Sequence, residues 1–181
     1  MTKNRMKHLI LFFSAAVFLL FTESAVSAQQ IVYADASAFP LYGKVSEDTD
    51  GRYERLPSHL KTVSREPVWY LGRNSAGLYI RFRSNSTSIH LRWESMFNNS
   101  MTHMTDTGTK GLDLYALQDG EWRHVCSAQP QGKKSERAVI RYMDPIEREY
   151  MLYLSLYDGI SSLEIGVEEG ASLAMPAVDS P

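Results

Sequence analysis

An acid and a phenol stand two positions apart in the run Gly111-Leu112-Asp113-Leu114-Tyr115. Successive side chains of a β-strand point to opposite faces, so Asp113 and Tyr115 would share one face while Leu112 and Leu114 enter the core. A carboxylate beside an aromatic ring suits a sugar, because the carboxylate accepts hydrogen bonds from hydroxyl groups and the ring offers an apolar surface. The structural alternative is that Asp113 ties down a loop or pairs with an arginine, while Tyr115 packs on a second domain.

Two further side chains could join such a site. His103 stands shortly before this strand in an irregular segment, from which it could complete a polar pocket with Asp113, reach toward a second domain or only brace the loop. Trp122 follows a predicted hairpin turn and is the tryptophan that we expect to be exposed, whereas Trp93 continues the inward phase of its strand. We therefore take His103, Asp113, Tyr115 and Trp122 as candidate substrate contacts.

Metal and cofactor chemistry find little support in the sequence. No pair of histidines has the spacing of metal ligands on one element, and Cys126 is the only cysteine. The segment 47–51 begins like a calcium loop but lacks the bidentate glutamate that such a loop needs. We therefore expect neither a metal site nor a cofactor.

Nucleophilic catalysis would need a serine on a nucleophile elbow. The stretch 72–77 is one residue off the Gly-x-Ser-x-Gly spacing, and a strand rather than a helix is predicted to follow it, whereas an elbow feeds a helix. An esterase built on this chain alone would require Ser75 to meet His90 or His103 in space. We expect no catalytic residue in the chain.

The first 28 residues have the pattern of an export signal. A basic start, an apolar run and small residues at a cleavage point follow one another: Lys3, Arg5 and Lys7, then 9–21, then Val26-Ser27-Ala28. The apolar run is shorter than the roughly 20 residues that span a bilayer. We expect cleavage before Gln29, export to the periplasm or the outside, and no membrane attachment afterwards.

Composition limits the class of the remaining chain. Residues 29–181 carry 16 basic and 20 acidic side chains, a balance that argues against a nucleic-acid partner. With one cysteine, no intrachain disulfide can form, so an apolar core must stabilise the fold.

Apolar residues alternate with polar ones along much of the chain, which predicts an all-β protein. The strands 78–82 and 89–93, separated by the polar segment 84–87, are predicted to form a hairpin. A second hairpin joins 111–117 to 121–126 through Asp119-Gly120, a strong turn signal. Further strands are expected at 31–35, 68–71, 138–142, 150–154 and 163–167, and one short helical turn at 145–150. This pattern favours a single antiparallel sandwich or barrel.

Three segments lack this alternation. The segment 46–55 is polar and predicted to be an exposed loop, and 96–108 is a long connection in which function is first expected. Residues 169–181 have lost the strand pattern and are interpreted as a linker toward a further domain.

The run 111–115 resembles the Gly-x-Asp-Leu-Tyr signature of the N-terminal β-domain of SGNH (GDSL-type) hydrolases. Other landmarks of that domain follow in the same order from about 31 to 167: Arg55-Leu56-Pro57, Pro67-Val68-Trp69, Asn74-Ser75-Ala76-Gly77-Leu78, the run 80–86, Arg92-Trp93, His103-Met104, Trp122, Leu156-Tyr157-Asp158-Gly159 and Leu163-Glu164-Ile165-Gly166-Val167. The resemblance covers essentially the whole mature chain.

This resemblance implies a jelly-roll-like antiparallel β-sandwich over 29–168. In that family the nucleophilic serine, the oxyanion hole and the Asp/His pair belong to the following SGNH domain, and none has a counterpart in this chain. We therefore expect a non-catalytic accessory domain of an exported carbohydrate esterase. Its partner would be the catalytic domain, in the same chain or an adjacent one, and the substrate an acylated glycan.

A free-standing carbohydrate-binding module is the alternative function. The two hypotheses predict different surfaces. An accessory domain should expose an apolar patch for its partner, whereas a sugar-binding module should expose a polar groove with an aromatic platform.

Overall fold

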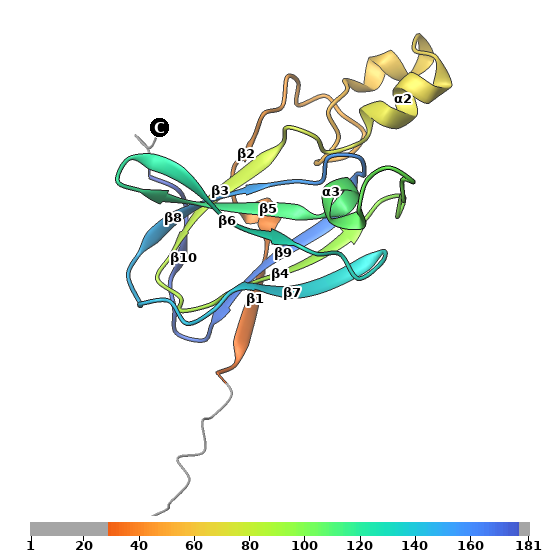
Figure 1. The fold of residues 1–181 in the computed structure, drawn as a ribbon. Helices are drawn as coiled ribbons and strands as arrows, with labels where there is room; N and C mark the ends of the chain where they lie inside the picture. Colours follow the sequence, from red (N-terminus) through yellow and green to blue (C-terminus); the bar gives the residue numbers. More distant parts are fainter. Residues whose placement is uncertain (1–28, 178–181) are drawn as a thin grey trace, which may run out of the picture.

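The computed structural model describes residues 29–177; the predicted export signal, 1–28, lies outside the described residues. The described chain forms two antiparallel sheets packed face to face (Figure 1). The four-stranded sheet has the order β1-β9-β4-β7, and the six-stranded sheet has the order β10-β3-β8-β5-β6 with β2 also paired to β3. The strands are β1 Ile31–Asp35, β2 Leu41–Tyr42, β3 Tyr79–Ser84, β4 Ile89–Ser95, β5 Leu112–Gln118, β6 Glu121–Ala128, β7 Lys134–Ile140, β8 Arg148–Tyr153, β9 Ile160–Glu168 and β10 Leu173–Ala174.

The core lies between the sheets and consists of the inward-pointing residues of the alternating runs. Phe82 and Tyr150 stack at its centre with ring centroids 5.3 Å apart. The fully buried apolar side chains also include Leu78, Ile80, Ile89, Leu91, Leu112, Leu114, Leu152 and Ile165. The predicted all-β sandwich is therefore confirmed.

Four short helical segments connect the strands: η1 Ala36–Ala38, η2 Ser58–Thr62, α2 Glu66–Gly72 and α3 Asp106–Lys110. Figure 1 shows α2 and α3 at one end of the sandwich and the tip of the β5–β6 hairpin at the other. The predicted strand 68–71 is wrong, because it lies in α2. Pro67 occupies the first turn of this helix, where its fixed φ favours helical geometry and its missing N–H costs no hydrogen bond.

The predicted hairpin between β3 and β4 is also wrong, because the two strands belong to different sheets. Their connection crosses from one sheet to the other and is held by side-chain hydroxyls. Thr87 and Ser88 donate to the Glu168 carboxylate over 2.6 and 3.0 Å, and Ser84 donates to the carbonyl of Ser172. Polar residues after a strand therefore mark a turn without showing which sheet the next strand joins.

The β5–β6 hairpin is confirmed. Asp119 and Gly120 have φ values of 55° and 80°, the left-handed pair that a two-residue hairpin turn requires. Leu112 pairs with Ala128 and Gln118 with Glu121, with one irregularity after Leu114.

Three further segments differ from their predicted structure. β10 pairs with β3 through Leu173 and Ala174, so the sandwich continues into the range expected to be a linker. The expected helical turn at 145–150 is wrong, since its last three residues belong to β8. In the segment 46–55, Tyr53 and Glu54 are buried instead of exposed. The predicted loop is thus anchored to the core.

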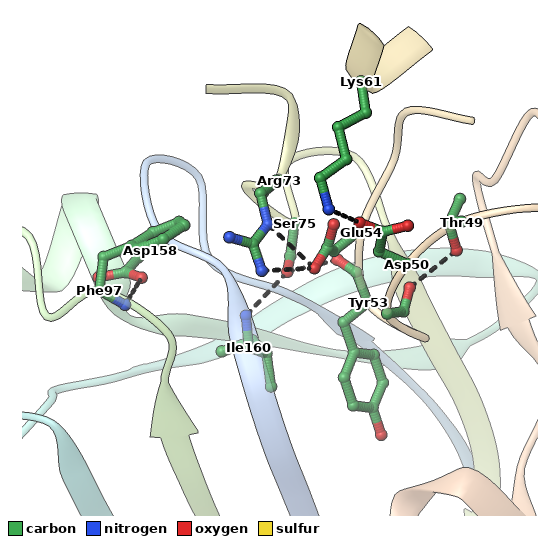
Figure 2. A network of polar contacts seen from close by, with 11 residues as sticks. Thr49, Asp50, Tyr53, Glu54, Lys61, Arg73, Ser75, Phe97, Asp158 and Ile160 are labelled. Atoms are coloured by element: carbon green, nitrogen blue, oxygen red, sulfur yellow. Dashed lines mark hydrogen bonds and ion pairs between the residues drawn. The ribbon is translucent and has the colours of Figure 1, made fainter. Parts of the chain in front are cut away.

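A polar network anchors this segment at the α2 end of the sandwich (Figure 2). Glu54 accepts hydrogen bonds from the Arg73 guanidinium over 3.0 and 3.2 Å, just after α2. Asp158, in the turn before β9, accepts from the backbone N–H of Phe97 and of Asn99. These bonds fasten the start of the 96–108 connection to the sandwich, so its conformation is set by the fold.

Candidate functional site

The family-like run 111–115 divides its side chains as strand alternation predicts. Leu112 and Leu114 are fully buried, whereas Asp113 is exposed and Tyr115 half-buried on the outer face of the six-stranded sheet. Gly111 has a different role, since a Cβ there would lie 2.3 Å from the carbonyl oxygen of Thr107 and 2.7 Å from that of Ala128. Glycine thus permits α3 and β6 to approach the start of β5.

Asp113 lies in a polar cluster with two residues of the paired strand. Ser127 donates its hydroxyl proton to Asp113 Oδ1 over 2.6 Å, and His124 Nε2 lies 3.2 Å from Ser127 Oγ and 4.0 Å from Asp113 Oδ1. Because the serine proton goes to the carboxylate, Ser127 accepts from His124. The geometry is therefore that of a hydrogen-bonded cluster and not of a Ser-His-Asp triad, in which histidine takes the serine proton.

Sequence reasoning missed the contributions of His124 and Ser127. Their signal was the hairpin register, which places Ser127 opposite Asp113 and His124 opposite Tyr115. Counting residues back from the Asp-Gly turn gives the Tyr115–His124 pair, but the irregularity between Leu114 and Tyr115 shifts the register by one, so the same count would place Cys126 and not Ser127 opposite Asp113.

A row of touching rings crosses the same outer face. We call Tyr42, Tyr79, Tyr153, Tyr115 and His124 the aromatic band; they come in that order from β2, β3, β8, β5 and β6. Successive ring centroids are 5.2, 5.0, 5.6 and 5.3 Å apart. The band joins every strand of the six-stranded sheet except β10, and it arises from residues far apart in the sequence.

Trp122 lies on this face as well, nearer the hairpin tip. The Arg81 guanidinium lies 5.1 Å from the Trp122 ring and 5.7 Å from the Tyr42 ring, and it pairs with Glu149 over 2.6 Å. Trp122, the tryptophan expected to be exposed, is half-buried, and its ring packs beside this cation. Trp93 is buried, as predicted.

A pocket of about 380 Å³ opens beside Asp113, at the α3 end of the face. It is lined by hydroxyl-bearing and apolar side chains, among them Thr105, Thr107, Asp113, Ser127, Tyr153 and Leu156. Its combination of one carboxylate, several hydroxyls and one phenol ring suits a small polyhydroxylated ligand.

His103 is not joined to this cluster. It lies in an exposed turn closed by Met101 and Met104, and among residues 29–177 it makes no hydrogen bond or ion pair. Thr105, two residues later, lines the pocket and caps α3 by accepting from the N–H of Gly108. His103 is therefore not among the residues that line the pocket, and its side chain is exposed.

Ser75 is unsuited to be a nucleophile. It is fully buried, donates to the carbonyl of Tyr53 over 2.8 Å and accepts from the N–H of Ile160 (Figure 2). Its hydroxyl is thus used to join three segments, and the hypothesis of an esterase centred on Ser75 loses its nucleophile.

Electrostatics near Asp113 affect the lone thiol. Burial, and secondarily the charge of Asp113, raise the pKa of Cys126. Cys126 is half-buried against the core and has little thiolate at neutral pH, so it is not poised for reaction. Within residues 29–177, no three His, Cys, Asp or Glu side chains gather as metal ligands would, and no helix has the length and apolar character to cross a membrane.

Comparisons with known proteins agree on the class of this domain. A family described as "GxDLY: N-terminus of Esterase_SGNH_hydro-type" matches residues 31–173. A solved protein described as a GDSL-like lipase, from Bacteroides ovatus ATCC 8483, is similar with 34% identity and a TM-score of 0.77, over 82% of this chain and 44% of that one. The salicylyl-acyltransferase SsfX3 from a tetracycline biosynthetic pathway shares the fold, with 20% identity and a TM-score of 0.56 over 85% and 43% of the two chains. The search of curated proteins gives no match.

The molecule is therefore an all-β sandwich of the kind found at the head of SGNH-type esterases. The chain belongs to the GxDLY family, whose domain is the N-terminus of those enzymes. It spans less than half the length of the two solved proteins it resembles.

Proposed function

We propose that this chain is the non-catalytic accessory domain of an exported SGNH-type carbohydrate esterase, and that it shapes the approach of an acylated glycan to the catalytic domain. The observation that supports this most is the division of the signature run. Gly111 and the two leucines serve the fold, whereas Asp113 and Tyr115 face outward beside a pocket. Side chains on that face are available to a partner or a substrate.

In this role the chain supplies position and recognition, and the catalytic domain supplies the chemistry. Asp113 would accept hydrogen bonds from glycan hydroxyls at the pocket, and Tyr153 would give one apolar wall. The acyl transfer to a serine and its hydrolysis belong to the catalytic domain, with no group of this chain required for the bond-breaking step.

A chimera tests this proposal. In it, the chain replaces the matching segment of the Bacteroides ovatus GDSL-like lipase, and hydrolysis of p-nitrophenyl acetate is compared among the chimera, the isolated chain and the lipase with that segment deleted. We expect hydrolysis by the chimera above that of the deleted lipase, and none by the isolated chain. Ester hydrolysis by the isolated chain, or a chimera no better than the deletion, would contradict the proposal.

A free-standing carbohydrate-binding module is the second candidate, favoured by the polar pocket with its phenol wall. Titration calorimetry of the isolated chain with acetylated xylo-oligosaccharides, taken together with the chimera assay, separates the two. Binding that is abolished by Asp113→Ala but kept in the control Asp119→Ala, at the hairpin tip, would favour the module if the chimera also hydrolyses no faster than the deleted lipase.

A further inference from the structure

The two outer faces of the sandwich differ in chemistry. On the four-stranded sheet the exposed groups are paired charges: the Arg92 guanidinium pairs with Glu136 over 3.0 Å and lies 3.6 Å over the Tyr33 ring, and Glu94 faces Lys134. Covering such a face would desolvate ion pairs that water now stabilises. That face is therefore suited to solvent.

The six-stranded sheet also has ion pairs, Arg81 with Glu149 and Arg83 with Glu147, but the aromatic band crosses its outer face. Its four tyrosines are half-buried, and each touches the next ring, so the band is a continuous surface and not a set of isolated side chains. Aromatic residues are enriched where proteins meet, because they bury a large area with few rotatable bonds. Asp113 and Trp122 lie at its two margins.

The end of the described chain lies on this same face. Arg83 donates to the carbonyl of Met175 over 2.8 Å, and the N–H of Ala177 donates to Glu149 Oε2 over 3.2 Å. Glu149 in turn pairs with Arg81, whose guanidinium lies between the rings of Tyr42 and Trp122. A segment attached after Ala177 therefore starts beside the aromatic band.

We propose that the aromatic band is the docking surface for the SGNH-type catalytic domain. This rests on the proposed function: the family forms the N-terminus of such esterases, and the related solved chains are more than twice as long as their match to this one. The partner surface would place apolar side chains over the tyrosine rings of the band, and Asp113, at the margin of the band, would stay open to the pocket. The outward position of Tyr115 is then explained by this contact.

A second apolar surface is the competing position. On α2, Val68, Tyr70 and Leu71 are exposed. Tyr70 is already used within the domain, since it packs on Phe97 and donates to Asn99. The helix also lies at the end of the sandwich opposite the hairpin tip (Figure 1), whereas Ala177 is held by Glu149 on the outer face of the six-stranded sheet.

Hydroxyl-radical footprinting with mass-spectrometric detection tests the docking surface directly. Oxidation of each tyrosine is compared between the isolated chain and the chimera with the Bacteroides ovatus lipase. We expect oxidation of Tyr115 and Tyr153 to fall several-fold in the chimera. Tyr33, half-buried on the opposite outer face, is the matched control and should not change. Tyr70 reports on α2.

Each outcome is decisive. Protection of Tyr115 and Tyr153 supports the docking surface, whereas protection of Tyr70 alone, or of no tyrosine, overturns it. Hydrolysis by a chimera whose band stays accessible would leave the accessory function standing and remove this interface. A protected band in a chimera that shows no hydrolysis would support this interface and contradict the accessory function. Should the chimera fail to fold, the intact lipase is footprinted instead. Protection of its residues on the strands aligned with β5 and β8, relative to its N-terminal domain alone, gives the same test.

A pair of variants adds an energetic test. Tyr115→Lys places a charge in the band, and Ala138→Lys places the same charge on the outer face of the four-stranded sheet. Tyr115→Lys should lower the melting temperature more in the chimera than in the isolated chain, because both proteins lose the ring contacts with Tyr153 and His124 but only the chimera also loses the contact with the catalytic domain. Ala138→Lys should have the same effect in both. Equal losses for Tyr115→Lys in both proteins would count against the docking surface.

Discussion

Asp113 shows how one carboxylate can serve several neighbours. It accepts the Ser127 hydroxyl, lies within 4.0 Å of His124 and contributes to the raised pKa of Cys126. Its exposure means that solvent screens these effects, so each is modest. Removing its charge should therefore alter the reactivity of its surroundings without unfolding the domain.

The Cys126 thiol provides the readout for that change. In Asp113→Asn, alkylation of Cys126 by iodoacetamide at about pH 8 should be faster than in the unchanged chain, by no more than about threefold, because burial is the larger cause of the raised pKa. Asp119→Asn, which removes the same charge at the hairpin tip, is the control. Equal rates for Asp113→Asn and the unchanged chain would exclude the charge effect.

For single residues, the sequence predicts which face of the sheet a side chain points to, but not which other side chains it contacts. Alternation was enough to place Asp113 and Tyr115 outward, because side-chain direction is a local property of a strand. The contacts with His124, Ser127 and Tyr153 depend on how three strands are registered, which no local pattern encodes. His103 had no strand to orient it, and its place in an exposed turn could not be derived.

The close approach of α3 and β6 to β5 depends on a missing side chain. Gly111→Ala should lower the free energy of unfolding by roughly 1–3 kcal/mol, because the new Cβ meets two backbone carbonyls that cannot move independently. Gly108→Ala, inside α3, meets only the flexible Met104 side chain and gains helix propensity, so it should be neutral or slightly stabilising. Urea denaturation of both variants measures the difference, and equal stabilities would contradict the proposed role of Gly111.

Glu168 makes the β3–β4 crossing sensitive to acid. Burial by itself would raise the pKa of Glu168, but hydrogen bonds from Thr87 and Ser88 outweigh it and lower the pKa below its usual 4.5. A folded-state pKa below the unfolded value stabilises the domain above about pH 4.5, and this stabilisation is lost as the pH falls through the folded-state value.

Substitution should remove this pH dependence. Between about pH 6 and about pH 3, Glu168→Gln should lose less stability in urea denaturation than the unchanged chain, although it is less stable at neutral pH. Glu169→Gln, at the exposed neighbouring position, should retain the original slope. An unchanged slope in Glu168→Gln would show that this carboxylate is not responsible.

At the scale of elements, a hairpin or helix could be predicted correctly only where one local sequence signal was sufficient to define it. The Asp119-Gly120 pair fixes a hairpin by itself, since few other residues adopt two left-handed conformations in succession. The β3–β4 connection contains no such pair, and its serines and threonines bind Glu168 from a strand about 80 positions later. For α2, Val68, Trp69 and Tyr70 favoured a strand, whereas Pro67 in the first turn favours the helix that the structure shows.

At the scale of the whole molecule, the described residues form a two-sheet sandwich with two unlike outer faces, and the single cysteine permits no intrachain disulfide to hold it. Expression of the complete chain in a bacterial host with a periplasm tests where this frame operates. We expect the exported protein to begin at Gln29, as measured by intact mass, because the small residues 26–28 suit a signal peptidase. A cytoplasmic protein retaining Met1 would contradict the predicted export.

The strand order of the four-stranded sheet also determines when the domain can fold during its synthesis. Ile31, at the start of β1, pairs with Glu168, at the end of β9, and β9 also separates β1 from β4. A nascent chain therefore lacks the strand that joins β1 to β4 until nearly the entire domain has left the ribosome. Such long-range pairing makes folding slow and late, so any truncation before β9 would release a chain with unpaired strand edges, the form most prone to aggregate.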